Sequence, residues 1–236
     1  MSKRHTERIR CLYRIIGWHE TLAVLNWMKV RNVDRGSQGF KALCIAFKKA
    51  VDAGIKYPGI MEEALTLIHK ATRGDQYLSS DPDAFAGMVE AGLQTLKQEF
   101  EFLVLPSTNM PDLAEESVFV TGQADQSHPQ MPTGLHVPSF VTLHSFVGAL
   151  GIAGDDDGLL HLLQWMSQSF AELKEASQER QNGNKNMRLA LVAVRMYLEQ
   201  SPSKSKIQEG YEIFRQTGWE WPSDEEIGEY SRGLYK

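Results

Sequence analysis

Cysteine and long apolar runs are scarce in this sequence of 236 residues. The two cysteines, Cys11 and Cys44, lie within apolar helical patterns and have no metal-ligand spacing around them. We therefore interpret both as small core residues in a reducing compartment, not as a disulfide. No stretch approaches the roughly 18 apolar residues that a transmembrane helix needs, so no membrane segment is expected. Because Arg8, Arg10 and Arg14 interrupt the first apolar run, no secretory signal is expected either.

The sequence also lacks the common motifs of catalysis and cofactor binding. It has no glycine-rich phosphate loop and no G-x-S-x-G nucleophile elbow. Its seven histidines include no pair at the spacing of a helical zinc site. The triplet Asp155–Asp157 contains possible oxygen ligands, but three consecutive side chains at a helix start cannot all face one ion, which favours helix capping. We expect no enzyme, no cofactor, no metal and no small-molecule substrate.

Positive charge is concentrated in the N-terminal quarter. Residues 1–56 carry 12 Lys and Arg against 4 Asp and Glu, a net charge of +8. Residues 57–236 carry the other 13 Lys and Arg and 26 Asp and Glu, a net charge of −13. Only the N-terminal block is therefore expected to attract phosphate.

Apolar residues recur at helical spacing in most of the chain, and no strand pattern is found, which predicts an all-α fold. The clearest stretch is Val141–Met166, which reads as two short helices that meet at a corner. Gly154 can adopt the left-handed conformation that closes the first helix, and Asp155 can cap the second. Neither helix can bury its apolar face alone, so the pair is expected to stack on similar pairs.

This stretch resembles the pentatricopeptide repeat, a helix-turn-helix unit of a family that binds RNA. The family pattern VTYNTLIDALCKAGDLDEALELFEEM lies over Val141–Met166 without a gap. Agreement, direct or near, covers Val141-Thr142, Phe146, Ala149-Leu150, Ala153-Gly154-Asp155, Asp157, Leu160, Leu162 and Met166. Two departures are His144 for the usual Asn and Leu159 for a small Ala. The related tetratricopeptide repeat obeys the same packing logic. The resemblance implies an α-solenoid of about four imperfect hairpins, about ten helices.

Weaker units extend this interpretation to the rest of the chain. Residues 1–16 give a basic amphipathic helix, Gly17 breaks the pattern, and residues 19–28 parallel residues 157–166, with Trp27 at the position of Trp165. Residues 39–71 resemble another unit, with a long corner over residues 51–60. Residues 207–217 resemble the second helix of a fourth unit, with Gly210 at its small position, and Ser223–Glu226 is a capping box.

The chain divides into a basic helical-repeat block (1–104), a long proline-containing insert (105–138) and an acidic helical-repeat block (139–236). Residues 1–16 are either the first helix of a repeat, which we favour, or part of a mitochondrial targeting segment. The resemblance implies a mitochondrial location, with a cytoplasmic one as the alternative. The chain can also be a piece of a longer repeat array, because solenoids need capping units.

The resemblance implies binding of single-stranded organellar RNA. The family uses the position of His144 to contact a base edge and the position of Val141 to wedge between bases. Lys41 lies at the matching position of the earlier unit, and we expect it to bind phosphate together with Lys48 and Lys49. The alternative is a scaffold whose groove binds a protein partner, which the acidic C-terminal block favours. We expect Trp27 and Trp165 to pack between units, although stacking on bases is also possible.

Overall fold

The computed structural model describes residues 3–31, 36–73, 83–104, 138–169, 173 and 183–233. These ranges contain nine helices and no strand, so the predicted all-α class is confirmed for them. The helices are α1 (Lys3–Val30), α2 (Gly36–Lys56), α3 (Ile60–Arg73), α4 (Ala84–Val104), α5 (Phe140–Ile152), α6 (Asp156–Gln168), α8 (Gly183–Gln200), α9 (Lys204–Thr217) and α10 (Asp224–Ser231). Residues 105–137 of the predicted insert lie outside the described residues.

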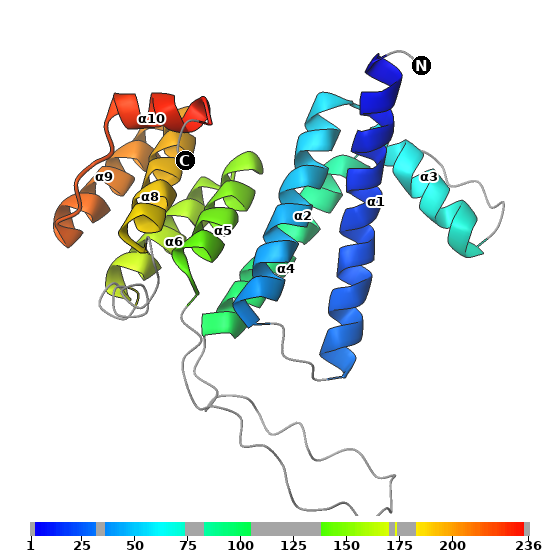
Figure 1. Ribbon diagram of the computed structural model, residues 1–236, viewed down its shortest axis with the longest axis horizontal. Coiled ribbons are helices and arrows are strands. Elements are labelled where there is room, and N and C mark those ends of the chain that lie inside the picture. The colour runs from blue at the N-terminus through cyan, green and yellow to red at the C-terminus, as the bar shows by residue number, and fades with distance from the viewer. Residues whose placement is uncertain are drawn as a thin grey trace, which may run out of the picture.

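The helices pack in two layers (Figure 1). The front layer consists of α1, α2, α5 and α8, which lie side by side in that order because each packs against the next. The back layer consists of α3, α4, α6 and α9. Of these, α3 packs on α1, α4 on α2, α6 on α5, and α9 on α6 and α8. The short helix α10 packs across α8.

A chain of aromatic side chains joins the two halves of the sequence. Phe40 of α2 meets Phe146 of α5, with ring centroids 5.2 Å apart. Phe100 of α4 lies 4.9 Å from Phe146 and 5.1 Å from Trp165 of α6. Aromatic contacts of this kind stabilise a core beyond the area that they bury. One hydrophobic cluster therefore includes buried residues from both halves. Trp165 packs between helices as expected.

The corner between α5 and α6 confirms the prediction made from the central repeat pattern. Gly154 has a φ of 72°, the left-handed conformation that ends many helices. The Asp155 side chain accepts a hydrogen bond from the backbone N–H of Gly158 at 3.0 Å and so caps α6. Asp155 also pairs with Lys97 of α4 at 2.6 Å. The corner is thereby tied to the N-terminal half.

Local packing confirms three further expectations. Cys11 and Cys44 are free thiols with no exposed surface. At Gly210 an added Cβ would lie 2.6 Å from Cδ1 of Leu198, so the small residue lets α9 approach α8. The capping box at the start of α10 is complete, because the Ser223 and Glu226 side chains each accept a hydrogen bond from the other residue's backbone N–H.

The break predicted at Gly17 is wrong. α1 runs without interruption through Gly17, so residues 3–30 form one helix and not a hairpin. A glycine inside a helix costs only about 1 kcal/mol relative to alanine. Burial of Ile15 and Trp18, which flank it, against the rest of the molecule outweighs that cost. The packing predicted for Trp27 is also wrong, since its side chain is 52% exposed and lies under the guanidinium of Arg31.

The long corner predicted over residues 51–60 is also wrong. α2 continues to Lys56, and α3 begins at Ile60. Gly54 is helical, and an added Cβ there would lie 2.0 Å from Cε2 of Phe85 on α4, so this glycine serves close packing and not a turn. α3 then packs mainly on α1 instead of returning along α2. The N-terminal half therefore does not repeat the α5–α6 hairpin in tandem.

Candidate nucleic-acid interface

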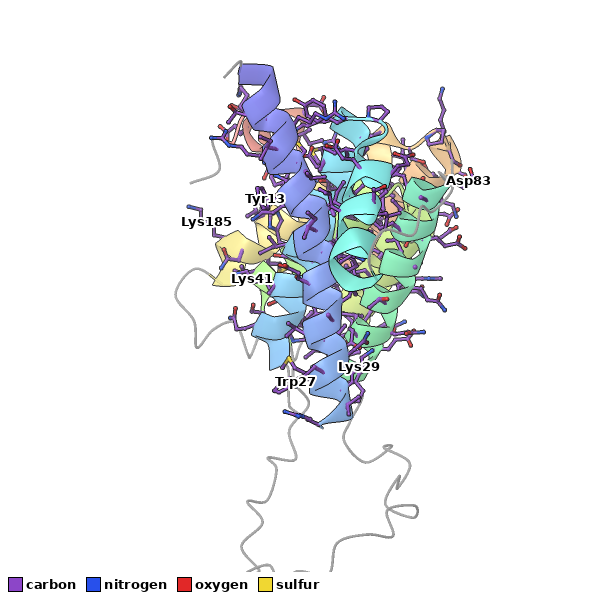
Figure 2. The ribbon with its side chains drawn as sticks, turned by 90° about the vertical axis from the view of Figure 1, so that its right-hand side faces the viewer. Tyr13, Trp27, Lys29, Lys41, Asp83 and Lys185 are labelled. Atoms are coloured by element: carbon purple, nitrogen blue, oxygen red, sulfur yellow. The ribbon has the colours of Figure 1, made fainter. Side chains whose placement is uncertain are left out.

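The sequence-predicted site residues lie on α2 and α5, on the side of the front layer that the back layer leaves uncovered. We call this surface the open face. On α2 it includes Lys41 and Lys48, which are seven residues apart and therefore on one side of the helix. Lys49 is exposed about 100° further around α2. Figure 2 shows Lys41 on the same side of the molecule as Lys185 of α8.

The Lys48 side chain reaches from α2 to α5 because the residue of α5 that it meets, Gly148, has no side chain. An added Cβ at Gly148 would lie 3.2 Å from Nζ of Lys48 and would crowd it. No ion pair joins Lys41, Lys48 or Lys49 to a carboxylate among the described residues. Their positive charges therefore remain available for a ligand of negative charge.

His144 lies one turn before Gly148 on the open face and is half-buried. Its Nε2 is 2.8 Å from the hydroxyl oxygen of Tyr230 on α10, a hydrogen bond between residues far apart in the sequence. The two rings meet edge to face with centroids 5.7 Å apart. Burial, and next the positive charge of Lys48, lower the pKa of His144 to about 4. The imidazole is therefore neutral at pH 7.

Val141 is half-buried and precedes His144 by three residues, so both lie on one side of α5. The first turn of α5 is fixed from two directions. Ser139 caps the helix by accepting a hydrogen bond from the Thr142 backbone N–H at 3.3 Å. The Thr142 hydroxyl, fully buried, is 2.8 Å from the Ser37 hydroxyl at the start of α2. The structure therefore places Lys48 beside Gly148 and His144 of α5, and Val141 lies one turn before His144 on the same helix. Lys41 lies two turns before Lys48 on α2.

The docking of α10 beside this site was not anticipated. Arg188 of α8 donates through Nε and Nη2 to the two carboxylate oxygens of Glu226, each at 2.7 Å, and through Nη1 to the Glu220 carbonyl. Arg195, one more heptad along α8, donates to the Pro222 carbonyl and to Asp224. The hydrogen bonds from Arg188, above all, lower the pKa of Glu226 to about 2.

Sequence reasoning therefore missed Tyr230, Arg188 and Arg195. The available signal was two arginines seven residues apart on one helix and an acidic short helix downstream, which is weak because most such charges are solvated. The same docking gives the open face a charge gradient. Its α2 end carries the three lysines, whereas α10 carries Glu225 and Glu229 in addition to Asp224 and Glu226, which pair with Arg195 and Arg188.

The Asp triplet at the start of α6 behaves as capping and pairing residues. Asp155 caps the helix, Asp156 accepts a hydrogen bond from Ser201, and Asp157 pairs with Lys206 at 2.7 Å. Three carboxylates that turn to three different partners do not converge on one ion. Among the described residues no group of three or more His, Cys, Asp or Glu could hold a metal, and no helix is long and apolar enough to cross a membrane.

Comparison with protein families, curated proteins and solved structures found no significant match to this chain.

Proposed function

We propose that this protein binds single-stranded RNA through the open face and performs no catalysis on it. The observation that carries the proposal is the set of three lysines on α2, none of which forms an ion pair with a described carboxylate, and of which Lys48 lies against Gly148 of α5. Phosphate contacts supply most of the affinity for a nucleic acid, and they need such cations. The resemblance of Val141–Met166 to the pentatricopeptide repeat supports RNA, in the mitochondrion, as the ligand.

The same proposal interprets the two layers as a short, irregular α-solenoid. α5–α6 and α8–α9 are consecutive hairpins whose first helices lie in the front layer and whose second helices lie in the back layer. α1 to α4 place two helices in each layer by a different chain order. Side-by-side helices of one layer are the surface on which repeat proteins bind extended ligands.

The lysines and α5 have different roles in this proposal. Lys41, Lys48 and Lys49 hold phosphates without selecting a sequence, whereas Val141 and His144 contact bases. A base edge can form a hydrogen bond with Nε2 of His144 only when the hydrogen bond between Nε2 and the Tyr230 hydroxyl is broken. We therefore assign affinity to α2 and base preference to α5.

The affinity part is tested by binding to a pool of short single-stranded RNAs at two salt concentrations. The logarithm of the affinity should fall with the logarithm of salt with a slope of about −0.7 per phosphate neutralised. The triple variant Lys41→Gln, Lys48→Gln, Lys49→Gln should flatten the slope by about 2. The matched control Lys204→Gln, Arg215→Gln, Arg232→Gln removes the same charge from exposed positions of the other half and should leave the slope unchanged.

The base-contact part is tested with Tyr230→Phe. This variant keeps the ring that packs on His144 and removes only the hydroxyl. It should change the ranking of RNA homopolymers while the salt slope stays constant. If wild type and triple lysine variant bind RNA equally weakly at low salt, the RNA proposal is refuted.

A protein-interaction scaffold is the second candidate, and one observation favours it. The Tyr230–His144 hydrogen bond places acidic α10 at one end of the open face, where it repels a phosphate chain but not a peptide with basic residues. This candidate predicts little salt-sensitive RNA binding. It predicts instead a partner whose capture is weakened when Glu225 and Glu229 are changed to Gln.

A further inference from the structure

The outer side of α1 is an apolar surface at the end of the front layer. α2 lies between α1 and α5, α5 lies between α2 and α8, and α10 packs on α8 at the far end. α1 packs on α2 and α3, and its remaining side exposes large apolar side chains (Figure 2). The exposed fractions are 69% for Tyr13, 57% for Val24 and 52% for Trp27. Surfaces of this kind commonly mark protein contacts.

Six residues on this side of α1 follow the spacing of a coiled-coil seam. The steps between them alternate between four and three residues, which is the a/d pattern that places all of them on one side of a helix. They are Tyr13, Gly17, Glu20, Val24, Trp27 and Arg31. This stripe lies apart from the buried side of α1, where Cys11, Ile15 and Trp18 pack into the core.

Gly17 in the middle of this stripe is not explained by packing within the chain. Its backbone is helical, its φ is not positive, and an added Cβ would meet nothing within 4 Å. A helical glycine without such a reason is unfavourable relative to alanine. Elsewhere, the helical glycines Gly54 and Gly151 receive an aromatic ring of a neighbouring helix, whereas Gly87 of α4 resembles Gly17 in meeting nothing within 4 Å. Gly17 offers the same kind of space on an uncovered surface.

We propose that this stripe is the contact surface for a second copy of the chain, with the two α1 helices antiparallel. In an antiparallel pair the a positions of one helix face the d positions of the other, and one register satisfies the whole stripe. This register pairs Trp27 with Gly17, Tyr13 with Arg31, and Glu20 with Val24, each twice. The indole fills the space over the glycine, and the guanidinium of Arg31, already 4.6 Å from the Trp27 ring centroid, also faces a tyrosine ring.

Charge is the reason for choosing this arrangement over a parallel one. In a parallel dimer each residue faces its own copy, which would place Glu20 against Glu20, Arg31 against Arg31 and glycine against glycine. Such like-charge contacts disfavour an arrangement strongly. The antiparallel register has no like charges directly opposite. In this register each charged residue faces a neutral one, and the stripe is complementary to itself in size, as a two-fold interface requires.

Sedimentation of the full chain over the micromolar range tests the interface. Wild type should form a dimer, and Val24→Asp should raise the dissociation constant by about tenfold or more. Ile55→Asp is the matched control, because Ile55 of α2 is a β-branched residue with the same exposed fraction of 57% outside the stripe. It should leave the dissociation constant unchanged. Gly17→Gln should also weaken the dimer, because the longer side chain fills the space over residue 17. Since Gln favours the helix more than Gly does, weaker dimerisation of this variant cannot be caused by unfolding of α1.

Cross-linking tests the register. A mixture of Glu20→Cys and Val24→Cys chains should form a disulfide between unlike chains on oxidation, whereas Glu20→Cys alone should not link to itself. The native Cys11 and Cys44 are buried and should not react. Self-linking of Glu20→Cys would show a parallel pair. Linking of Tyr13→Cys to Val24→Cys would show a register one heptad away, and either result would overturn the proposed pairing.

The proposal is overturned if the chain stays monomeric at all concentrations or if Val24→Asp leaves the dimer intact. In either case the stripe would be a contact surface for a different protein. The result is independent of RNA binding. The triple lysine variant on α2 should dimerise as wild type does, because none of its three substitutions lies on α1.

Discussion

Replacement of Glu226 by Gln should loosen α10, because this carboxylate accepts two of the hydrogen bonds that hold α10 on α8. Arg188 donates two hydrogen bonds to it, at 2.7 Å each, and none of the residues of α10 is buried. Gln keeps the capping box, since its side-chain oxygen can still accept from the Ser223 backbone N–H. The change therefore removes the ion pair and retains the helix start.

The magnitude follows from the pKa of Glu226. A fall from the ordinary value of 4.5 to about 2 corresponds to roughly 3 kcal/mol. Because the side chain is 24% exposed and solvent screens the pair, we expect about 1–2 kcal/mol. Because the pKa is lowered on folding, this stabilisation is present above pH 4.5 and is lost as the pH falls toward 2.

Native-state hydrogen exchange of the α10 amides measures the effect. At pH 7, exchange in Glu226→Gln should be about 5 to 30 times faster than in wild type, after correction for intrinsic rates. Near pH 2 the two proteins should exchange alike. The control Glu225→Gln has the same charge change in the same helical turn and should show only the smaller effect of the helix dipole. Equal exchange in the two variants, or a difference that persists near pH 2, would refute the reasoning.

Three further predictions concern stability and ionisation. Leu162→Ala should lower the free energy of unfolding by roughly 2–5 kcal/mol, whereas His161→Ala on the exposed side of α6 should be nearly silent; equal losses in urea unfolding would mean that α6 is rotated. Gly154→Ala should destabilise by about 1 kcal/mol because its φ is positive, whereas Gly17→Ala should stabilise by about 0.5–1 kcal/mol, as thermal unfolding would show at a concentration where the protein is monomeric. The His144 imidazole should titrate near pH 4 in NMR spectra, and stability should fall as the pH drops from 6.5 toward 4 because the unfolded chain binds the proton first; a pKa of 6.5 or above would contradict its burial.

The helices could be predicted where local signals agreed. In Val141–Met166 the apolar spacing, Gly154 and Asp155 all indicated the same corner, and the structure has it. The capping box at Ser223 likewise marked the start of α10. Gly17 and Gly54 misled the interpretation because glycine has the same local signature whether it ends a helix or lies inside one, as Gly17 does and as Gly54 does against the Phe85 ring.

The candidate site could be predicted only in part. The exposure of Lys49 and the shared side of Lys41 and Lys48 follow from helical spacing alone. The partner of His144 does not, because Tyr230 lies 86 residues away and reaches α5 only through the docking of α10. No local pattern encodes such a contact.

The sequence by itself determined the helical class, the corner at Gly154, the helix caps, and the division of the chain into a basic N-terminal part and an acidic remainder. Each depends on residues within one or two helical turns of one another, where geometry is nearly fixed. The tertiary structure decided the order of helices in the two layers, the return of α3 to α1, and the closure of α10 over α8. These depend on which apolar surfaces fit each other across long stretches of chain, and many pairings share the same periodicity, so only packing selects one.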